Sequence, residues 1–213
     1  WSIGFTEPAA RIGSIALAGD GTIYAAGGTQ LLRSEDGMNF TAIESNLSGE
    51  FVALAAHTTQ STTLYAVVGD KGIFRSKDAG TTWTLMDVGP PRIGQLIHTD
   101  MAGSMETGWL YAVAADGLRF SMDCFCLWRA VEAVGSTVEA IAAQPGMPDR
   151  LVAASSAGLL ETVDGGRSWH SLRSPESEVT AIAITNDGEI LAGGIDGRLF
   201  SSKDAGMSWS PLE

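Results

Sequence analysis

The sequence predicts an all-β protein, a five-bladed β-propeller of four-stranded antiparallel blades, from three observations. The first is a motif, Ser/Thr-x-Asp-x-Gly-x-Ser/Thr-Trp, that recurs in five full or degraded copies. The second is the period of 40 to 45 residues between the central residues of the copies, Asp36, Asp78, Asp123, Asp164 and Asp204. Such a period is typical of a propeller blade or a solenoid turn. The third is the composition: 26 glycines and no sustained 3.6-residue apolar period favour short strands with tight turns, and hence the propeller.

A chain of 213 residues is expected to form one domain. The predicted blades cover residues 11–50, 51–91, 92–137, 138–178 and 179–213. Each blade begins with an apolar, small-residue inner strand and ends with a strand that leaves the tryptophan of the motif. Residues 1–10 are expected to add a closing strand to the last blade, because open sheet edges invite aggregation. The alternative is that they are the remnant of another blade.

The residue types of the motif are those of a folding device. A central aspartate accepts hydrogen bonds from its own loop, and glycine takes a positive φ that other residues adopt only at a cost. The tryptophan buries a large ring between neighbouring sheets while its N–H finds a carbonyl. We therefore expect a structural role for the five aspartates and for Trp83, Trp128, Trp169 and Trp209.

This motif resembles the Asp-box, or BNR, repeat of sialidase-like β-propellers, with one box in each blade, and the resemblance covers nearly the whole chain. In those families the box lies on the rim of the propeller, away from the central pocket, and is structural. The resemblance extends to bacterial photosystem II assembly factors of the Asp-box type, which are propellers that chaperone or dock membrane complexes. Those proteins have more blades and an Arg-rich patch that this chain lacks. The resemblance therefore implies protein docking as a general mode. We expect a non-catalytic scaffold or accessory subunit that docks a protein partner within a larger extracytoplasmic or membrane-associated complex.

The composition excludes several kinds of partner. With 25 acidic against 13 basic residues, the net charge of −12 disfavours both nucleic acid and an anionic membrane surface. The sequence contains no run of 18 apolar residues, so no transmembrane helix is predicted. The chain opens on Trp1 and not on methionine, which suggests a processed or truncated end. Removal of an export signal is one explanation, so we expect an extracytoplasmic location, periplasmic or secreted.

An enzyme is not expected. The sialidase resemblance implies three arginines around a carboxylate, a tyrosine nucleophile with a glutamate partner, and an aspartate acid. Here the tyrosines Tyr24, Tyr65 and Tyr111 share one repeat position, which indicates blade-core residues. No pair of catalytic carboxylates can be assembled, although glycosidases need one. A sugar-binding propeller lectin remains the alternative, but the loops between first and second strands differ from blade to blade. A small-molecule ligand and a cofactor are likewise not indicated.

The third blade departs most from the repeat and is the predicted site for a protein partner. It carries a long insertion at 100–109, and its motif has lost the turn glycine. Methionine, aromatic residues and arginine are enriched at interface cores. The candidate partner-binding residues, expected to form an exposed surface, are Met101, Met105, Trp109, Arg119, Phe120 and Phe125.

Cys124 and Cys126 are separated by one residue, a spacing too short for an ordinary disulfide. Thiolates select soft metals such as Cu(I), so the pair is a weak candidate for a metal site. Two ligands do not complete a site, and buried packing thiols in a degraded motif are the simpler interpretation. The histidines His57, His98 and His170 fall at three different repeat positions, so no ring of ligands is expected.

Overall fold

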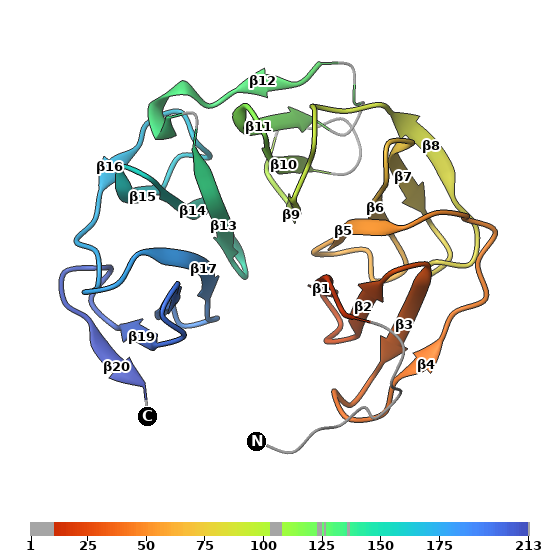
Figure 1. Cartoon of the computed structure of the whole chain (residues 1–213), viewed down its shortest axis with the longest axis horizontal. Helices are drawn as coiled ribbons and strands as arrows, with labels where there is room; N and C mark the ends of the chain where they lie inside the picture. The colour runs from red at the N-terminus through yellow and green to blue at the C-terminus, as the bar shows by residue number, and fades with distance from the viewer. Residues whose placement is uncertain (1–10, 103–107, 123–124, 126, 136, 213) are drawn as a thin grey trace.

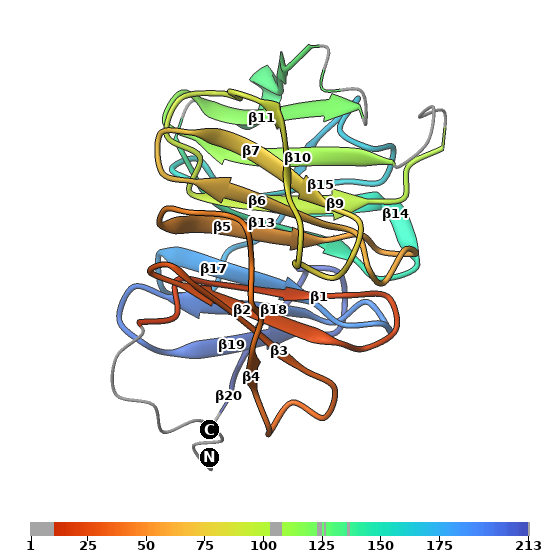
Figure 2. The same ribbon diagram turned by 90° about the vertical axis from the view of Figure 1, so that its right-hand side faces the viewer.

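The computed structural model describes residues 11–102, 108–122, 125, 127–135 and 137–212, and it confirms the predicted fold. Five four-stranded antiparallel sheets are arranged as the blades of a β-propeller (Figure 1). In each blade the strands follow one another in sequence order from the axis to the rim, and Figure 2 shows the blades from the side. The predicted closing strand at 1–10 lies outside the described residues.

The strand bounds are as follows. The first blade holds β1 (Ser14–Leu17), β2 (Ile23–Gly27), β3 (Gln30–Ser34) and β4 (Thr41–Ala42), and the second holds β5 (Phe51–Ala56), β6 (Leu64–Val68), β7 (Gly72–Ser76) and β8 (Thr84–Asp87). The third holds β9 (Gln95–Thr99), β10 (Trp109–Ala114), β11 (Gly117–Met122) and β12 (Arg129–Ala130), followed by the 3-10 helix η1 (Glu132–Val134). The fourth holds β13 (Val138–Gln144), β14 (Met147–Ser155), β15 (Gly158–Thr162) and β16 (His170–Ser171). The fifth holds β17 (Val179–Ile184), β18 (Ile190–Gly194), β19 (Leu199–Ser202) and β20 (Ser210–Leu212).

The hydrophobic core lies between consecutive blades and not inside any one of them. Because side chains alternate along a strand, each sheet presents one face to the blade before it and the other to the blade after it. In the second blade Leu54 packs toward the first blade, whereas Ala53 and Tyr65 pack toward the third. The small side chains of the inner strands let the blades approach closely. Tyr24, Tyr65 and Tyr111 are all buried, as their shared repeat position predicts.

Polar side chains also link the inner strands of neighbouring blades. The backbone N–H of Leu54 donates to Ser14 Oγ over 2.9 Å. Between the third and fourth blades, Gln95 replaces a backbone partner: its amide donates to the carbonyl of Ile141 over 2.8 Å and accepts from the N–H of Ile141 over 2.9 Å. These bonds occupy backbone groups of inner strands that would otherwise lack partners.

The repeated motif forms the turn between the third and fourth strands, and its aspartate holds that turn together. In the second blade Asp78 accepts from the N–H and the hydroxyl of Thr82, over 2.8 and 2.5 Å, and from Ser76 Oγ over 2.8 Å. Asp164 and Asp204 accept the same set of bonds from the serine four residues later. The indole N–H of Trp83 donates to the carbonyl of Gly80 over 2.8 Å. The geometry is that of a folding device, while Asp123 lies outside the described residues.

The same hydrogen bonds tie the stability of the turns to pH. The hydroxyl and the N–H of the Ser or Thr four residues later lower the pKa of Asp78, Asp164 and Asp204 from the ordinary 3.8 to about 2. A carboxylate whose pKa is lowered by folding stabilises the native state above its unfolded pKa, and that contribution disappears as the pH falls through the folded pKa. We therefore expect the melting temperature to decrease as the pH is lowered from about 4 to about 2, because these aspartates become protonated.

An Asp78→Asn variant isolates one turn in this pH range. The variant lacks the titrating carboxylate, so the difference in melting midpoint between wild type and variant should shrink as the pH falls from about 4 to about 2. Circular dichroism melts across the range measure this difference. A difference that stays constant with pH would mean that the ionised carboxylate does not stabilise the turn.

Candidate functional site

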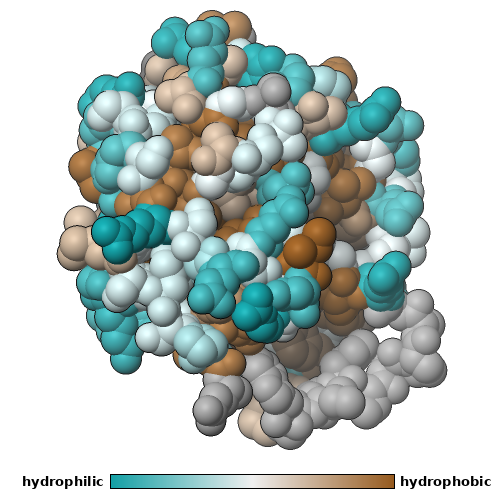
Figure 3. All heavy atoms as spheres, turned by 60° about the vertical axis from the view of Figure 1, so that its left-hand side comes forward, coloured by the Kyte–Doolittle hydropathy of each residue, from teal (hydrophilic) through white to brown (hydrophobic). Residues whose placement is uncertain are grey.

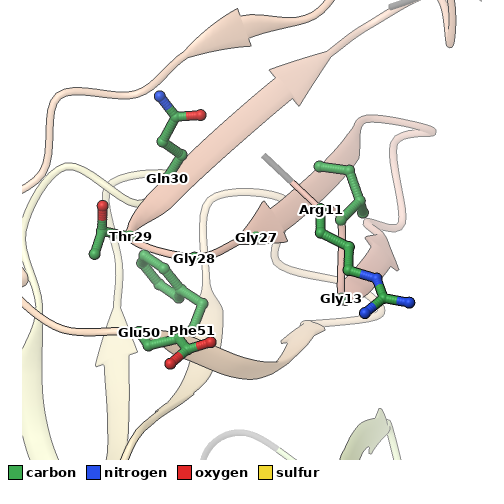
Figure 4. Close-up of a pocket in the computed structure, with 9 residues that line it drawn as sticks. Arg11, Gly13, Gly27, Gly28, Thr29, Gln30, Glu50 and Phe51 are labelled. Carbon is green, nitrogen blue, oxygen red and sulfur yellow. The ribbon is translucent and has the colours of Figure 1, made fainter. Parts of the chain in front are cut away.

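A groove opens where the first blade meets the second, beside the turn between β2 and β3 (Figure 4). Its volume is about 680 Å³, and it is lined by Arg11, Ile12, Gly13, Gly27, Gly28, Thr29, Gln30, Glu50 and Phe51. Phe51 is buried at its base, whereas the side chains of Arg11 and Glu50 are exposed. Charged groups of opposite sign therefore stand around one opening, Arg11 before the first strand of the first blade and Glu50 immediately before the first strand of the second.

Glycine makes this groove possible. A side chain at Gly27 would lie 2.3 Å from the carbonyl oxygen of Arg11, so only glycine allows the two segments to approach. Gly28 takes a left-handed φ of 55° at the turn and accepts a 2.7 Å hydrogen bond from the N–H of Phe51. The turn of one blade is thus bonded to the start of the next, which fixes the shape of the opening.

A second groove of about 680 Å³ lies at the next junction, between the second and third blades. It is walled by the turn at Gly69 and Asp70 and by Arg92 at the start of the third blade. Val52 and Val88 line it with exposed side chains, 38% and 72% accessible. Repeat-equivalent turns therefore build two neighbouring grooves, although their charged residues do not occupy equivalent positions.

The four charged residues of these grooves are available for binding. Arg11, Glu50, Asp70 and Arg92 are exposed, and within the described residues none of them forms a side-chain hydrogen bond or an ion pair. An exposed charge without an internal partner can bind one on another molecule without breaking a contact of its own. The sequence analysis did not assign a site to this region, although the triplet Arg-Ile-Gly recurs at 11–13 and 92–94 and could have drawn attention to it.

The third blade does not present the surface expected from the sequence. Met101 and Phe125 are 4% and 6% exposed, so the expectation that they form an exposed surface is wrong for these two. Met101 fills the space beside Gly165 of the next blade, where any side chain would lie 2.2 Å from its terminal methyl carbon. Phe125 takes the position of the turn glycine with a left-handed φ of 52° and packs near Tyr65, with ring centroids 6.0 Å apart.

Three of the expected residues remain partly exposed. Trp109 and Phe120 stack at 5.1 Å between centroids and 9° between planes. Arg119 forms an ion pair with Asp116 on the hairpin of the same blade. The remaining partner-binding candidate, Met105, and the metal candidates Cys124 and Cys126 lie outside the described residues. Among the described residues, the predicted partner surface of the third blade keeps Trp109, Arg119 and Phe120.

The structure also contains a buried ionic network that the sequence analysis missed. Arg150 Nε donates to Glu161 Oε1 over 2.7 Å, and its Nη1 donates to Gln144 over 2.7 Å and to the carbonyl of Gly188 over 3.1 Å. Glu161 is 5% exposed, and His170 lies 3.0 Å from its second oxygen. The network joins the fourth blade to a turn of the fifth, so its geometry is that of a structural link.

Tyrosines and potential metal ligands are the other side chains that could carry chemistry. Burial raises the pKa of the Tyr111 phenol, which donates to the carbonyl of Gly165 over 3.0 Å. Within the described part of the chain, no group of three or more His, Cys, Asp or Glu side chains is arranged to hold a metal ion. No described helix is long and apolar enough to cross a membrane.

Comparisons with known proteins place the chain among β-propellers. No protein-family model matches it. It is 30% identical over 175 residues to the dispase autolysis-inducing protein of Streptomyces mobaraensis, a match that covers 75% of this chain and 44% of that protein. The chain therefore spans less than half the length of this relative.

The fold is shared with solved structures, of which two are described. YCF48 bound to D1 peptide superposes with a TM-score of 0.65 at 17% identity, covering 98% of this chain and 71% of that one. The GH74 xyloglucanase from Xanthomonas campestris superposes with a TM-score of 0.66 at 18% identity, covering 95% of this chain and 38% of that one. At such identities the likeness shows the propeller fold alone.

Proposed function

We propose that this chain is a non-catalytic protein-interaction module of the Asp-box propeller superfamily, and that an extended segment of a partner protein binds across its two grooves. The observation that carries the proposal is the pair of neighbouring grooves, each bordered by an exposed arginine and an exposed carboxylate that form no ion pair with another described residue. The apolar lining of the second groove supplies area that can be buried, while the charges select the partner. YCF48, which shares the fold, is a propeller seen with a bound peptide.

Catalysis has no comparable support in the described residues. The carboxyl groups with the most strongly lowered pKa are the aspartates of the turns, whose oxygens are occupied by their own loops. The three tyrosines are buried in the blade junctions and cannot reach a substrate on the surface. We therefore expect no glycosidase activity. The proposal also places the protein outside the cytoplasm, which fractionation of the native cells would test.

Peptide display provides the direct test. A library of extended peptides selected on the chain should yield sequences with both acidic and basic residues. Arg92→Glu should weaken their binding by roughly tenfold, because a reversed charge repels the residue that Arg92 attracts. Lys203→Glu, on the exposed turn of the fifth blade, makes the same charge change away from the grooves and should leave the affinity unchanged. Equal binding to wild type and to Arg92→Glu would refute the groove assignment.

The third blade offers a second docking surface, formed by Trp109, Arg119 and Phe120. Arg119→Glu, measured with the same peptides, separates the two surfaces. If Arg119→Glu abolishes binding and Arg92→Glu does not, the partner docks on the third blade.

A propeller lectin is the alternative function. Grooves at successive junctions favour it, because lectin propellers repeat their sites. The unlike placement of the charges and the lack of a described exposed aromatic ring in either groove disfavour it. Glycan-array binding that is lost in Arg92→Glu would support the lectin.

A further inference from the structure

At each of the four junctions between consecutive blades, the sheet of one blade packs the face toward the next blade against the opposite face of that next sheet. In the second blade, the face toward the first blade includes Leu54, and the face toward the third includes Ala53 and Ile73. All three side chains are at most 2% exposed. The hydrophobic clusters of the described residues join blades one and two, two and three, three and four, and four and five. Within the part of the chain that the structure describes, no such cluster joins the fifth blade to the first.

The fifth blade exposes the face that the other blades bury. Strand register equates Ala181 with Ala53 and Leu199 with Ile73. Leu199 is 46% exposed and Ala181 is also exposed, whereas Ala53 and Ile73 are 1% and 0% exposed. Ile195, in the turn before Leu199, is 69% exposed.

The first blade exposes part of its opposite face. Register equates Ile15 with Leu54, and these residues are 66% and 2% exposed. Leu17, two residues further along β1, is 62% exposed. Leu32 on the same face is buried, so the open part is the inner strand.

The two exposed faces lie on the same side of the ring. Figure 1 shows the fifth and first blades facing each other across the open side, near both ends of the described chain. Figure 3 shows the side of the molecule that lies at the left in Figure 1, where hydrophobic side chains are scattered among hydrophilic ones. Exposed apolar faces of this kind mark interaction sites.

We infer that the open side of the ring binds at least one further four-stranded blade of the same repeat. The occupant is defined by the faces it must complement. Toward the fifth blade it presents a branched side chain such as that of Leu54 on its inner strand, and toward the first blade it presents small inner-strand residues such as Ala53. Both the YCF48 structure and the curated relative continue beyond the part that matches this chain, so such proteins have chain available for further blades.

The test adds a blade that is known to fit this kind of face. A copy of residues 43–91, which include the second blade and its natural connection, is joined after Glu213. In the extended chain Leu199→Lys should lower the melting midpoint by about 5 °C or more, because the lysine would be buried without a partner. In the 213-residue chain the same substitution faces water and should leave the midpoint unchanged. Val163→Lys, at a side chain that is 60% exposed on the fourth blade, is the matched control.

A second measurement does not depend on the folding of the added blade. The 213-residue chain should bind the dye ANS, and the double variant with Ile15→Lys and Leu199→Lys should bind clearly less of it, unlike Val163→Lys. Equal effects of Leu199→Lys in both chains, or unchanged dye binding in the double variant, would overturn the inference. It would also be overturned by light scattering that shows a dimer of the 213-residue chain dissociated by Leu199→Lys, because a second copy would then cover the face.

Discussion

Replacing Arg150 by methionine is expected to destabilise the protein by about 3 to 5 kcal/mol, because it leaves the carboxylate of Glu161 buried without its cation. The side chains of Arg150 and Glu161 are 11% and 7% exposed, and Nε and Oε1 are 2.7 Å apart. The substitution also removes the donor to Gln144 and to the carbonyl of Gly188, which link the fourth and fifth blades. Urea unfolding at neutral pH measures the loss of stability.

The controls for this prediction separate burial from charge. Combining Arg150→Met with Glu161→Leu removes both charges from the interior, and the double variant should recover most of the lost stability. Arg198→Met breaks an exposed pair with Asp196, whose side chains are 51% and 37% accessible, and should leave the stability nearly unchanged. A double variant as unstable as Arg150→Met would show that packing of the arginine, and not its charge, is what matters.

The fold could be predicted from the sequence because its instructions are local and repeated. Asp78 accepts hydrogen bonds from Ser76 and Thr82, which lie within four residues of it, so the turn can be predicted from a short stretch of sequence. The strand alternation is equally local, and repetition at a fixed period identified the blade. The position shared by Tyr24, Tyr65 and Tyr111 predicted their burial for the same reason.

The site could not be predicted to the same degree because it depends on contacts between blades. Met101 looked like a surface residue in an insertion, but Gly165 of the next blade leaves a space that its side chain fills. Phe125 is a poor turn residue by its conformation, yet burial beside Tyr65 offsets that cost. The first groove brings together Arg11 and Glu50 from the two ends of the first blade, and no pattern in the sequence relates these two.

The ionic network left a trace in the sequence that comparison between blades could have revealed. Glu161 occupies the register position that Arg33 and Arg75 hold in the first two blades. An acidic residue where other repeats have arginine indicates a blade-specific partner. The partner, Arg150, is on the neighbouring strand β14 of the same blade, two residues before Val152, which is the residue opposite Glu161. Departures from the repeat thus indicate stabilising contacts as readily as functional ones.

Trp83→Ala is expected to cost about 3 to 5 kcal/mol, as for other large aromatic residues removed from a core. Trp83 is 7% exposed, packs edge-on against Phe51 at 6.3 Å between centroids, and donates to the carbonyl of Gly80. It thereby joins the turn of the second blade to the junction with the first. Trp83→Phe keeps most of the packing and loses the hydrogen bond, so it should cost about 1 kcal/mol.

Trp209 tests whether the last blade is as firmly packed as the second. It occupies the same motif position, but it is only partly buried and donates to the carbonyl of Arg173. Trp209→Ala should therefore cost about 2 kcal/mol, because less apolar surface leaves the core. Denaturant unfolding of both alanine variants gives the comparison. Equal costs would mean that the fifth blade is buried in solution to the same extent as the second, a result that would favour self-association of the chain over a free end face.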